Sequence, residues 1–358
     1  MINGFIDILI YIVIAWLTFN ILYLVRRDYF ERKGVKLYYG VVLVYKKPYS
    51  FHSFQGNNTI RKLSYIAVIA AVYGVYVFYA TMIAALLSKL GLIVLPAKPR
   101  VLIPGINITG IDLLYFALAI LIAALVHELA HALVAASNNI EVKGLGFAIL
   151  FFLPVAFTEI NEEMFVKSSR KSKILTLSAG PASNIILALI MMFLLSLIIS
   201  SSGLVIIGVE ENSLAARYGI KENTIILEVN GKPATLDELS KVLHVNKTTY
   251  FSLKLLYPNG TIKTLNIVKP ENTTKLGVLL TFMPSTFLLS IFGIQGALTF
   301  VSIIRWIYIV NMSLGIINIA PIFVTDGARI IQELFGNTTA TNIVSTITLL
   351  LLLVLFLP

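Results

Sequence analysis

The stretch that decides the fold is residues 111–137, IDLLYFALAILIAALVHELAHALVAAS. Between positions 113 and 136 its only acidic, basic or imidazole side chains are His127, Glu128 and His131. About 20 apolar residues, at a rise of about 1.5 Å each, span the roughly 30 Å hydrocarbon core of a membrane. Ionisable groups at that depth are costly, and they are usually paired and functional. We therefore expect a membrane-spanning helix that carries a polar site.

The three polar residues form the pattern His-Glu-x-x-His. Positions i and i+4 share one face of a helix, so both imidazoles can bind one metal ion. Glu128 is then placed to act as a general base on a metal-activated water. Two other interpretations are a solvated stripe on a surface helix and a polar cluster that pins two membrane helices. The apolar flanks argue against the first, and we favour the metal site.

The composition indicates a polytopic α-helical membrane protein, because 58% of the 358 residues are hydrophobic and only 13% are charged. The 28 Lys and Arg exceed the 18 Asp and Glu. Basic cytoplasmic loops explain this excess, so we expect no nucleic-acid partner. The absence of cysteine excludes thiolate ligands. With only four histidines, a third metal ligand is expected to be a carboxylate.

We expect about six transmembrane helices, at residues 4–25, 66–95, 111–137, 174–201, 307–323 and 341–357. Whether the apolar residues 287–303 also cross the membrane stays open. The predicted domains are 1–110 (N-terminal helices and a cytoplasmic loop), 111–202 (a catalytic core), 203–276 (an inserted domain) and 277–358 (a C-terminal membrane region).

The distribution of positive charge predicts the orientation. Residues 26–62 hold nine Lys and Arg against two acidic residues, and residues 138–173 hold five Lys and Arg. Because cytoplasmic loops are rich in Lys and Arg, both segments are expected on the cytoplasmic side. The His-Glu-x-x-His site then lies towards the cytoplasm, and the inserted domain lies on the extracytoplasmic side.

Residues 144–157, GLGFAILFFLPVAF, are apolar but too short to span, and Pro154 and two glycines interrupt them. We expect a re-entrant hairpin whose edge can pair with an extended substrate. Residues 203–276 differ, with charges of both signs and the pattern of an α/β domain. There we predict a strand at 223–231 that ends in an Asn-Gly turn, a capping box at 235–238, and a hairpin around 258–260.

Two further polar positions stand out in the membrane segments. Asn184 ends a cluster of small residues, SAGPASN at 178–184. Close helix packing explains the small residues well, but it explains the asparagine less well. Asp326 follows a span that runs inward, which brings it to the depth of His127 and His131. It is the natural carboxylate for the metal, and the alternative is a helix cap at the membrane edge.

Together, HELAH at 127–131, SAGPASN at 178–184 and NIAPIFVTDG at 318–327 resemble the motifs of the site-2 proteases, which are intramembrane zinc metalloproteases. The resemblance covers residues 111–335. It implies one Zn²⁺ ion held by His127, His131 and Asp326, with Glu128 as the catalytic base. The third motif departs from its more usual form, which has Leu after Asn and before Asp, but it keeps the Asn, Pro, Asp and Gly positions.

The resemblance also implies the substrate: peptide bonds within or near the transmembrane segments of single-span membrane proteins. The inserted domain looks like a PDZ module, which could bind a peptide C-terminus, and Asn184 and Asn318 would bind the substrate backbone or the oxyanion. Two other functions are a metal-ion transporter and a non-catalytic membrane scaffold. A transporter predicts inverted repeats, which the sequence does not show convincingly. The intact set of site residues argues against a scaffold.

Overall fold

The computed structural model describes residues 2–40, 42–47, 51–94, 101–150, 153–271 and 273–356. The chain divides into two compact units. Unit 1 comprises Met1–Met191 and Trp306–Pro358, and unit 2 comprises Met192–Arg305. The turn of the predicted hairpin, at 151–152, and the last residues of the predicted spans 66–95 and 341–357 lie outside the described residues.

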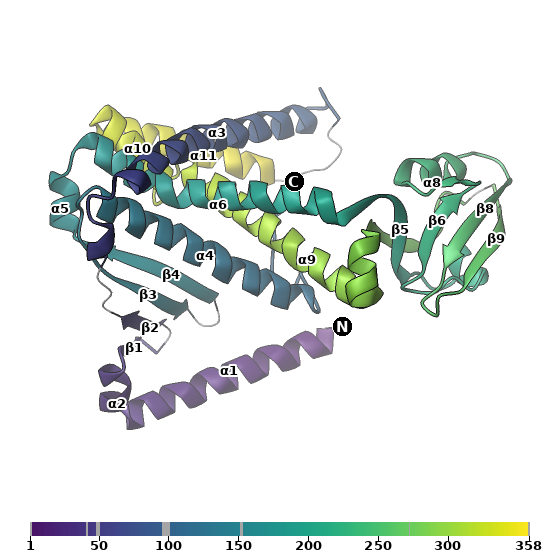
Figure 1. The fold of residues 1–358 in the computed structure, drawn as a ribbon, viewed down its shortest axis with the longest axis horizontal. Coiled ribbons are helices and arrows are strands. Elements are labelled where there is room, and N and C mark those ends of the chain that lie inside the picture. The colour runs from purple at the N-terminus through teal and green to yellow at the C-terminus, as the bar shows by residue number, and fades with distance from the viewer. Residues whose placement is uncertain are drawn as a thin grey trace. The chain divides into compact units, whose positions relative to one another are not determined.

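Four helices in the described part of the chain are long and apolar enough to cross a membrane. They are α3 (Asn58–Lys89), α4 (Asp112–Ser137), α6 (Arg170–Ile198) and α9 (Thr286–Ile319), as Figure 1 shows. The chain is thus a helical multi-pass membrane protein. Two further helices, α1 (Ile2–Val25) and α11 (Thr338–Phe356), contain shorter apolar segments. The expected count of six transmembrane helices therefore stays a prediction.

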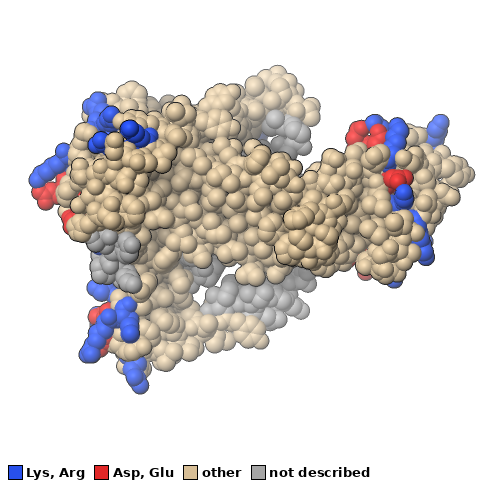
Figure 2. Space-filling view, in the orientation of Figure 1, with Lys and Arg blue, Asp and Glu red and all other residues tan. Residues whose placement is uncertain are grey.

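The surface of unit 1 agrees with a membrane environment. Charged side chains gather at the end that carries α2 (Arg27–Arg32) and α5 (Glu162–Lys167), while the visible surface over the middle of the long helices shows no Lys, Arg, Asp or Glu (Figure 2). Many large apolar side chains on these helices are exposed, among them Ile69, Val72 and Leu114. Exposed apolar surface of this kind is stable when it faces lipid.

Helix α9 joins the apolar residues 287–303 to most of the span predicted at 307–323. The structure has one element, Thr286–Ile319, with a break in the helical backbone at Gly293 (φ 63°, ψ −179°). Glycine adopts positive φ without a steric penalty, so the chain bends there and then continues as helix. The helix ends two residues before Pro321, whose ring cannot continue it.

A four-stranded antiparallel sheet belongs to unit 1, with the order β1-β2-β3-β4. Its strands are β1 (Val35–Tyr38), β2 (Val42–Lys47), β3 (Val142–Leu150) and β4 (Leu153–Ile160). The predicted hairpin at 144–157 is therefore half of a larger sheet, because β2, in the segment before α3, pairs with β3, for example Val44 with Ala148. Strand β4 is an edge of this sheet and packs against α4.

Small residues allow the long helices of unit 1 to approach closely. A Cβ on Gly315 of α9 would meet Ile185 Cγ1 at 2.7 Å and Pro181 O at 2.9 Å, both on α6. A Cβ on Gly74 of α3 would meet Ile185 Cδ1 at 2.6 Å. Helix α6 runs through Pro181 without ending. Glycine thus lets α3 and α9 lie against α6, as is typical of membrane helices.

Unit 2 contains an antiparallel sheet of order β10-β5-β6-β8-β9, and β7 pairs with β6. The elements are β5 (Ile199–Val209), α7 (Leu214–Arg217), β6 (Ile225–Val229), β7 (Lys232–Pro233), α8 (Leu236–Leu243), β8 (Thr249–Leu256), β9 (Ile262–Lys269) and β10 (Val278–Pro284). The predicted Asn-Gly turn is confirmed, since Asn230 and Gly231 both have positive φ. The predicted cap is confirmed as well, since the Glu238 amide donates to Thr235 Oγ1 at 3.1 Å.

Candidate metal centre

Helix α4 places His127 and His131 one turn apart on the same face. Their Nε2 atoms lie 3.1 Å from each other, and the two rings are nearly perpendicular. His127 is buried and His131 is half-buried. Two imidazoles that turn the same ring nitrogen towards one point are arranged as a pair of metal ligands.

Asp326, the first residue of α10 (Asp326–Phe335), reaches the same point from a segment 195 residues away from His131 along the chain. Its Oδ2 lies 3.2 Å from His127 Nε2 and 3.3 Å from His131 Nε2. Within the described residues, these three side chains form the one group of at least three His, Cys, Asp or Glu residues that could hold a metal ion. The predicted ligands are therefore brought together.

The connection between α9 and α10 fixes where Asp326 stands. Thr325 caps α10, because its Oγ1 accepts from the Ala328 amide at 3.3 Å, and it donates to Ala320 O at 2.6 Å. A Cβ on Gly327 would overlap Ile319 O and would lie 2.7 Å from Ala320 O. The missing side chain lets the first turn of α10 touch the end of α9. Asp326 is thus held by local backbone contacts as well as by its two histidine neighbours.

The spacing and surroundings of the three ligand atoms fit zinc. A tetrahedral zinc site with bonds of about 2.0–2.1 Å places its ligand atoms about 3.3–3.4 Å apart, close to the distances in the structure. Gly180 of α6 faces both imidazoles, and a Cβ there would overlap His131 Nε2 and lie 2.6 Å from His127 Nε2. The absent side chain leaves room beside both nitrogens, so the residues present fit the predicted ion.

The other ring nitrogens of the two histidines face α6. His131 Nδ1 donates to the backbone carbonyl of Thr176 at 2.7 Å. The Asn184 side chain lies against His127, with Nδ2 3.3 Å from Nδ1. The sequence could not predict the Thr176 carbonyl as a partner, because every residue has a backbone carbonyl and the residue type does not show which one is used. It also did not reveal the role of Gly180, although the small-residue cluster at 178–184 was a signal for close packing.

Glu128 and Asn318 were also predicted as site residues, but neither belongs to the group of three ligands. Glu128 is half-buried on α4 and is not in the ligand group, and its backbone carbonyl accepts from Thr158 Oγ1 of β4 at 2.7 Å. Asn318 is half-buried in the last turn of α9, and its side chain forms no hydrogen bond within the described residues. The bond from Thr158 joins strand β4 to the turn of α4 that carries Glu128.

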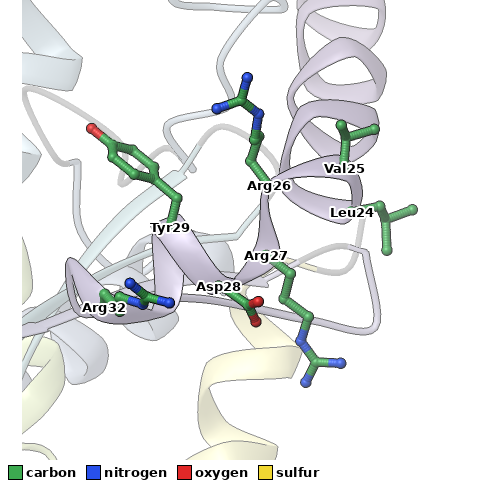
Figure 3. Close-up of a pocket in the computed structure, with 7 residues that line it drawn as sticks. All are labelled: Leu24, Val25, Arg26, Arg27, Asp28, Tyr29 and Arg32. Atoms are coloured by element: carbon green, nitrogen blue, oxygen red, sulfur yellow. The ribbon is translucent and has the colours of Figure 1, made fainter.

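A pocket elsewhere in unit 1 lies at the junction of α1 and α2. Figure 3 shows its lining side chains: Leu24, Val25, Arg26, Arg27, Asp28, Tyr29 and Arg32. It contains none of the predicted site residues. Its positive charge comes from the three arginines that follow the apolar segment of α1.

The fold and the site define a class: a multi-pass membrane protein in which two histidines and one aspartate are grouped closely enough to hold a metal ion. The family model for peptidase family M50 matches residues 115–355, more than half of the chain. The chain belongs to peptidase family M50, the site-2 protease family, which confirms the resemblance seen in its motifs. Membership of this family supports a metalloprotease activity.

Two relatives are similar to this chain over part of its length, and one of them is named as a metalloprotease. The chain is similar to a protein of Methanocaldococcus jannaschii named "Uncharacterized protein MJ0971", with 33% identity over 240 residues, 65% of this chain and 60% of the relative. It is also similar to a Campylobacter jejuni protein named "Putative zinc metalloprotease Cj1068", with 31% identity over 181 residues, 41% of this chain and 48% of the relative. The chain thus matches about half of the length of these curated relatives.

Proposed function

We propose that the protein is an intramembrane zinc metalloprotease that cuts peptide bonds within or near the transmembrane segments of other proteins. One observation carries the proposal: the side chains of His127, His131 and Asp326 bring three ligand atoms to within about 3.3 Å of one another, and the two histidines lie on α4, a helix long enough to cross a membrane. Family membership and the name of the Campylobacter jejuni relative, which describes a zinc metalloprotease, support the same chemistry.

His127, His131 and Asp326 would hold the ion, and Glu128 would move the proton. A zinc ion bound there supplies Lewis acidity, which lowers the pKa of water to about 7 and polarises a carbonyl oxygen. The Glu128 carboxylate accepts a proton from the attacking water as the water oxygen bonds to the carbonyl carbon. It then delivers that proton to the amine nitrogen as the C–N bond breaks.

Strand β4 is the proposed binding edge for the substrate. A membrane-spanning helix has all its carbonyls paired, so it must unwind locally before one of them can react. An extended segment can then pair with the backbone groups of an edge strand. Strand β4 lies at the edge of its sheet and packs against α4, and Thr158 on β4 is bonded to Glu128 O. This arrangement supports an extended substrate segment next to Glu128, and we propose that single-span membrane proteins supply it.

The orientation and the role of unit 2 belong to the same proposal. The basic segments 26–62 and 138–173 favour an active site towards the cytoplasm, with residues 203–276 on the other side and six helices crossing the lipid. The sheet and helices of unit 2 are compatible with a PDZ-like domain that binds a peptide C-terminus. Asn318, half-buried and without a hydrogen bond in the described part of the chain, remains a candidate for binding the substrate backbone or the oxyanion.

The proposal is tested with purified full-length protein and a model single-span substrate. Cleavage should stop when a chelator removes the metal, and it should return when zinc is added. Mass spectrometry of the products should place the cut within or next to the apolar segment. Cleavage that persists after the metal has been removed, or cuts confined to soluble loops, would refute the proposal.

A further inference from the structure

The side chain of Asn184 lies behind the metal-facing edge of His127. It is only 1% exposed, and its Nδ2 lies 3.3 Å from His127 Nδ1. Its Oδ1 is buried and has no hydrogen-bond partner in the described part of the chain. An amide so deeply buried cannot meet a substrate backbone, so the substrate or oxyanion role expected from the sequence does not account for it.

His131 shows which hydrogen-bond partner the Nδ1 of a metal-binding histidine needs at this site. His131 Nδ1 lies 2.7 Å from the Thr176 carbonyl, which can only accept a hydrogen bond. His131 Nδ1 therefore carries the hydrogen, and the lone pair of its Nε2 is free. That Nε2 is the atom that faces Asp326. Metal-binding histidines commonly donate their second N–H in this way, which fixes both the tautomer and the ring orientation.

His127 needs the same tautomer, because its Nε2 faces the same point. Its Nδ1–H then requires an acceptor, and the Asn184 amide occupies that position. If the amide nitrogen donated to Nδ1, the hydrogen would be forced onto Nε2 and would block a metal bond. A half-turn of the amide exchanges oxygen and nitrogen without changing its shape. With Oδ1 towards Nδ1, the unpaired oxygen gains a donor and Nε2 becomes free.

One face of α6 thus supports the histidine pair in three different ways. Thr176, Gly180 and Asn184 are spaced four residues apart, so they share that face. Thr176 contributes a carbonyl to His131, Gly180 contributes the space beside both Nε2 atoms, and Asn184 contributes its amide to His127. We propose that Asn184 is a positioning residue: it accepts from His127 Nδ1–H and so keeps Nε2 free to bind the metal. The inference rests on the proposed metal centre and not on any substrate.

The test measures zinc affinity of full-length protein by competition with a chelator, without substrate. Asn184→Leu removes the acceptor and should weaken zinc binding roughly 10–100-fold. Asn184→Asp keeps an acceptor oxygen and should stay within about threefold of the wild type. Asn311→Leu is the matched control. Asn311 is a fully buried asparagine of α9 whose Oδ1 also has no partner in the described chain, and it should not affect zinc binding.

Three results would overturn the assignment. Asn184→Leu could bind zinc with normal affinity but cleave substrate with a much lower kcat, which would indicate a substrate or oxyanion role. Asn184→Asp could weaken zinc binding as much as Asn184→Leu, which would exclude an acceptor role. Asn311→Leu could weaken it equally, which would indicate a general packing effect.

An independent measurement decides the case if Asn184→Leu does not fold. The chain has only four histidines, so their ring nitrogens can be assigned by ¹⁵N NMR. In the metal-free wild type and in metal-free Asn184→Asp, His127 should carry its hydrogen on Nδ1, whereas a hydrogen on Nε2 would refute the proposal. A protein that binds zinc in this way but cleaves no substrate would refute the proposed protease and leave this inference standing.

Discussion

At the scale of single residues, two glycines are as important to the site as the charged side chains. Gly180 leaves space beside the two histidine Nε2 atoms, and Gly327 lets the first turn of α10 touch the end of α9. Both positions are helical, where glycine is less favourable than alanine by roughly 1 kcal/mol. The structure explains this cost, because a side chain at Gly180 would overlap the imidazole of His131 and a side chain at Gly327 would overlap the backbone of Ile319 at the end of α9.

We predict that Gly180→Ala destroys the metal site. The added methyl group would overlap His131 Nε2, so zinc affinity should fall at least 100-fold, as measured by chelator competition. Gly315→Ala is the matched control, because its methyl group would also press on α6, 2.7 Å from Ile185 Cγ1. It should lower stability by about 1–3 kcal/mol but keep zinc affinity. Equal zinc affinities for the two variants would contradict this account of Gly180.

At the scale of elements, α10 carries the third ligand and is fastened to α6 by an ion pair. Lys173 Nζ lies 3.3 Å from both Glu333 Oε1 and Oε2, and both side chains are largely buried. Arg329 of α10 lies over the ring of Phe165 in α5, 5.3 Å from its centre. These contacts hold the helix that presents Asp326, so they bear on the metal site although they do not touch it.

Breaking the Lys173–Glu333 pair should weaken the metal site from a distance. Glu333→Gln leaves a half-buried ammonium without its counter-charge and should cost about 1–3 kcal/mol of stability, less than a fully buried pair would lose. Zinc affinity should fall several-fold, because α10 is less firmly placed. The exchange Lys173→Glu with Glu333→Lys should restore both. If the exchange restores stability and not zinc affinity, the pair does not position Asp326.

The elements also show what the sequence could and could not predict. The i, i+4 geometry of His127 and His131 is local, and Asp326 could be placed from the direction of the span before it. The pairing of residues 42–47 with 145–150 could not be predicted, because apolar strands far apart in the chain carry no signal of register. Whether Asn184 points towards His127 depends on how α6 is rotated about its axis relative to α4. That rotation is set by the close contact between Gly180 and the two imidazoles, which the sequence does not reveal.

At the scale of the whole molecule, the three ligands all belong to unit 1, although they come from distant parts of the chain. Helix α4 provides two of them and α10 provides the third. A bound ion therefore links two segments that are separated by the whole of unit 2 in sequence. A ligand that binds only the folded state stabilises it by about 4.1 kcal/mol at 1,000 times its Kd.

Metal removal should therefore loosen unit 1 selectively. Hydrogen exchange on purified protein should speed up in α4 and α10 after chelation, because the link between them is lost. The strands β5 to β10 of unit 2 should keep their protection, which provides an internal control within the same sample. Faster exchange in both units alike would indicate that the ion is bound elsewhere or supports the entire fold.

The most direct measurement compares zinc content and cleavage in Glu128→Gln. Glu128 is not one of the three ligands, so the purified variant should still hold one zinc ion per chain, as measured by elemental analysis. Cleavage of a single-span model substrate should fall by roughly 10²–10⁴-fold, because the amide cannot accept the proton. A variant that cuts at the wild-type rate would contradict Glu128 as the general base. A variant that loses its zinc would contradict the ligand set of His127, His131 and Asp326.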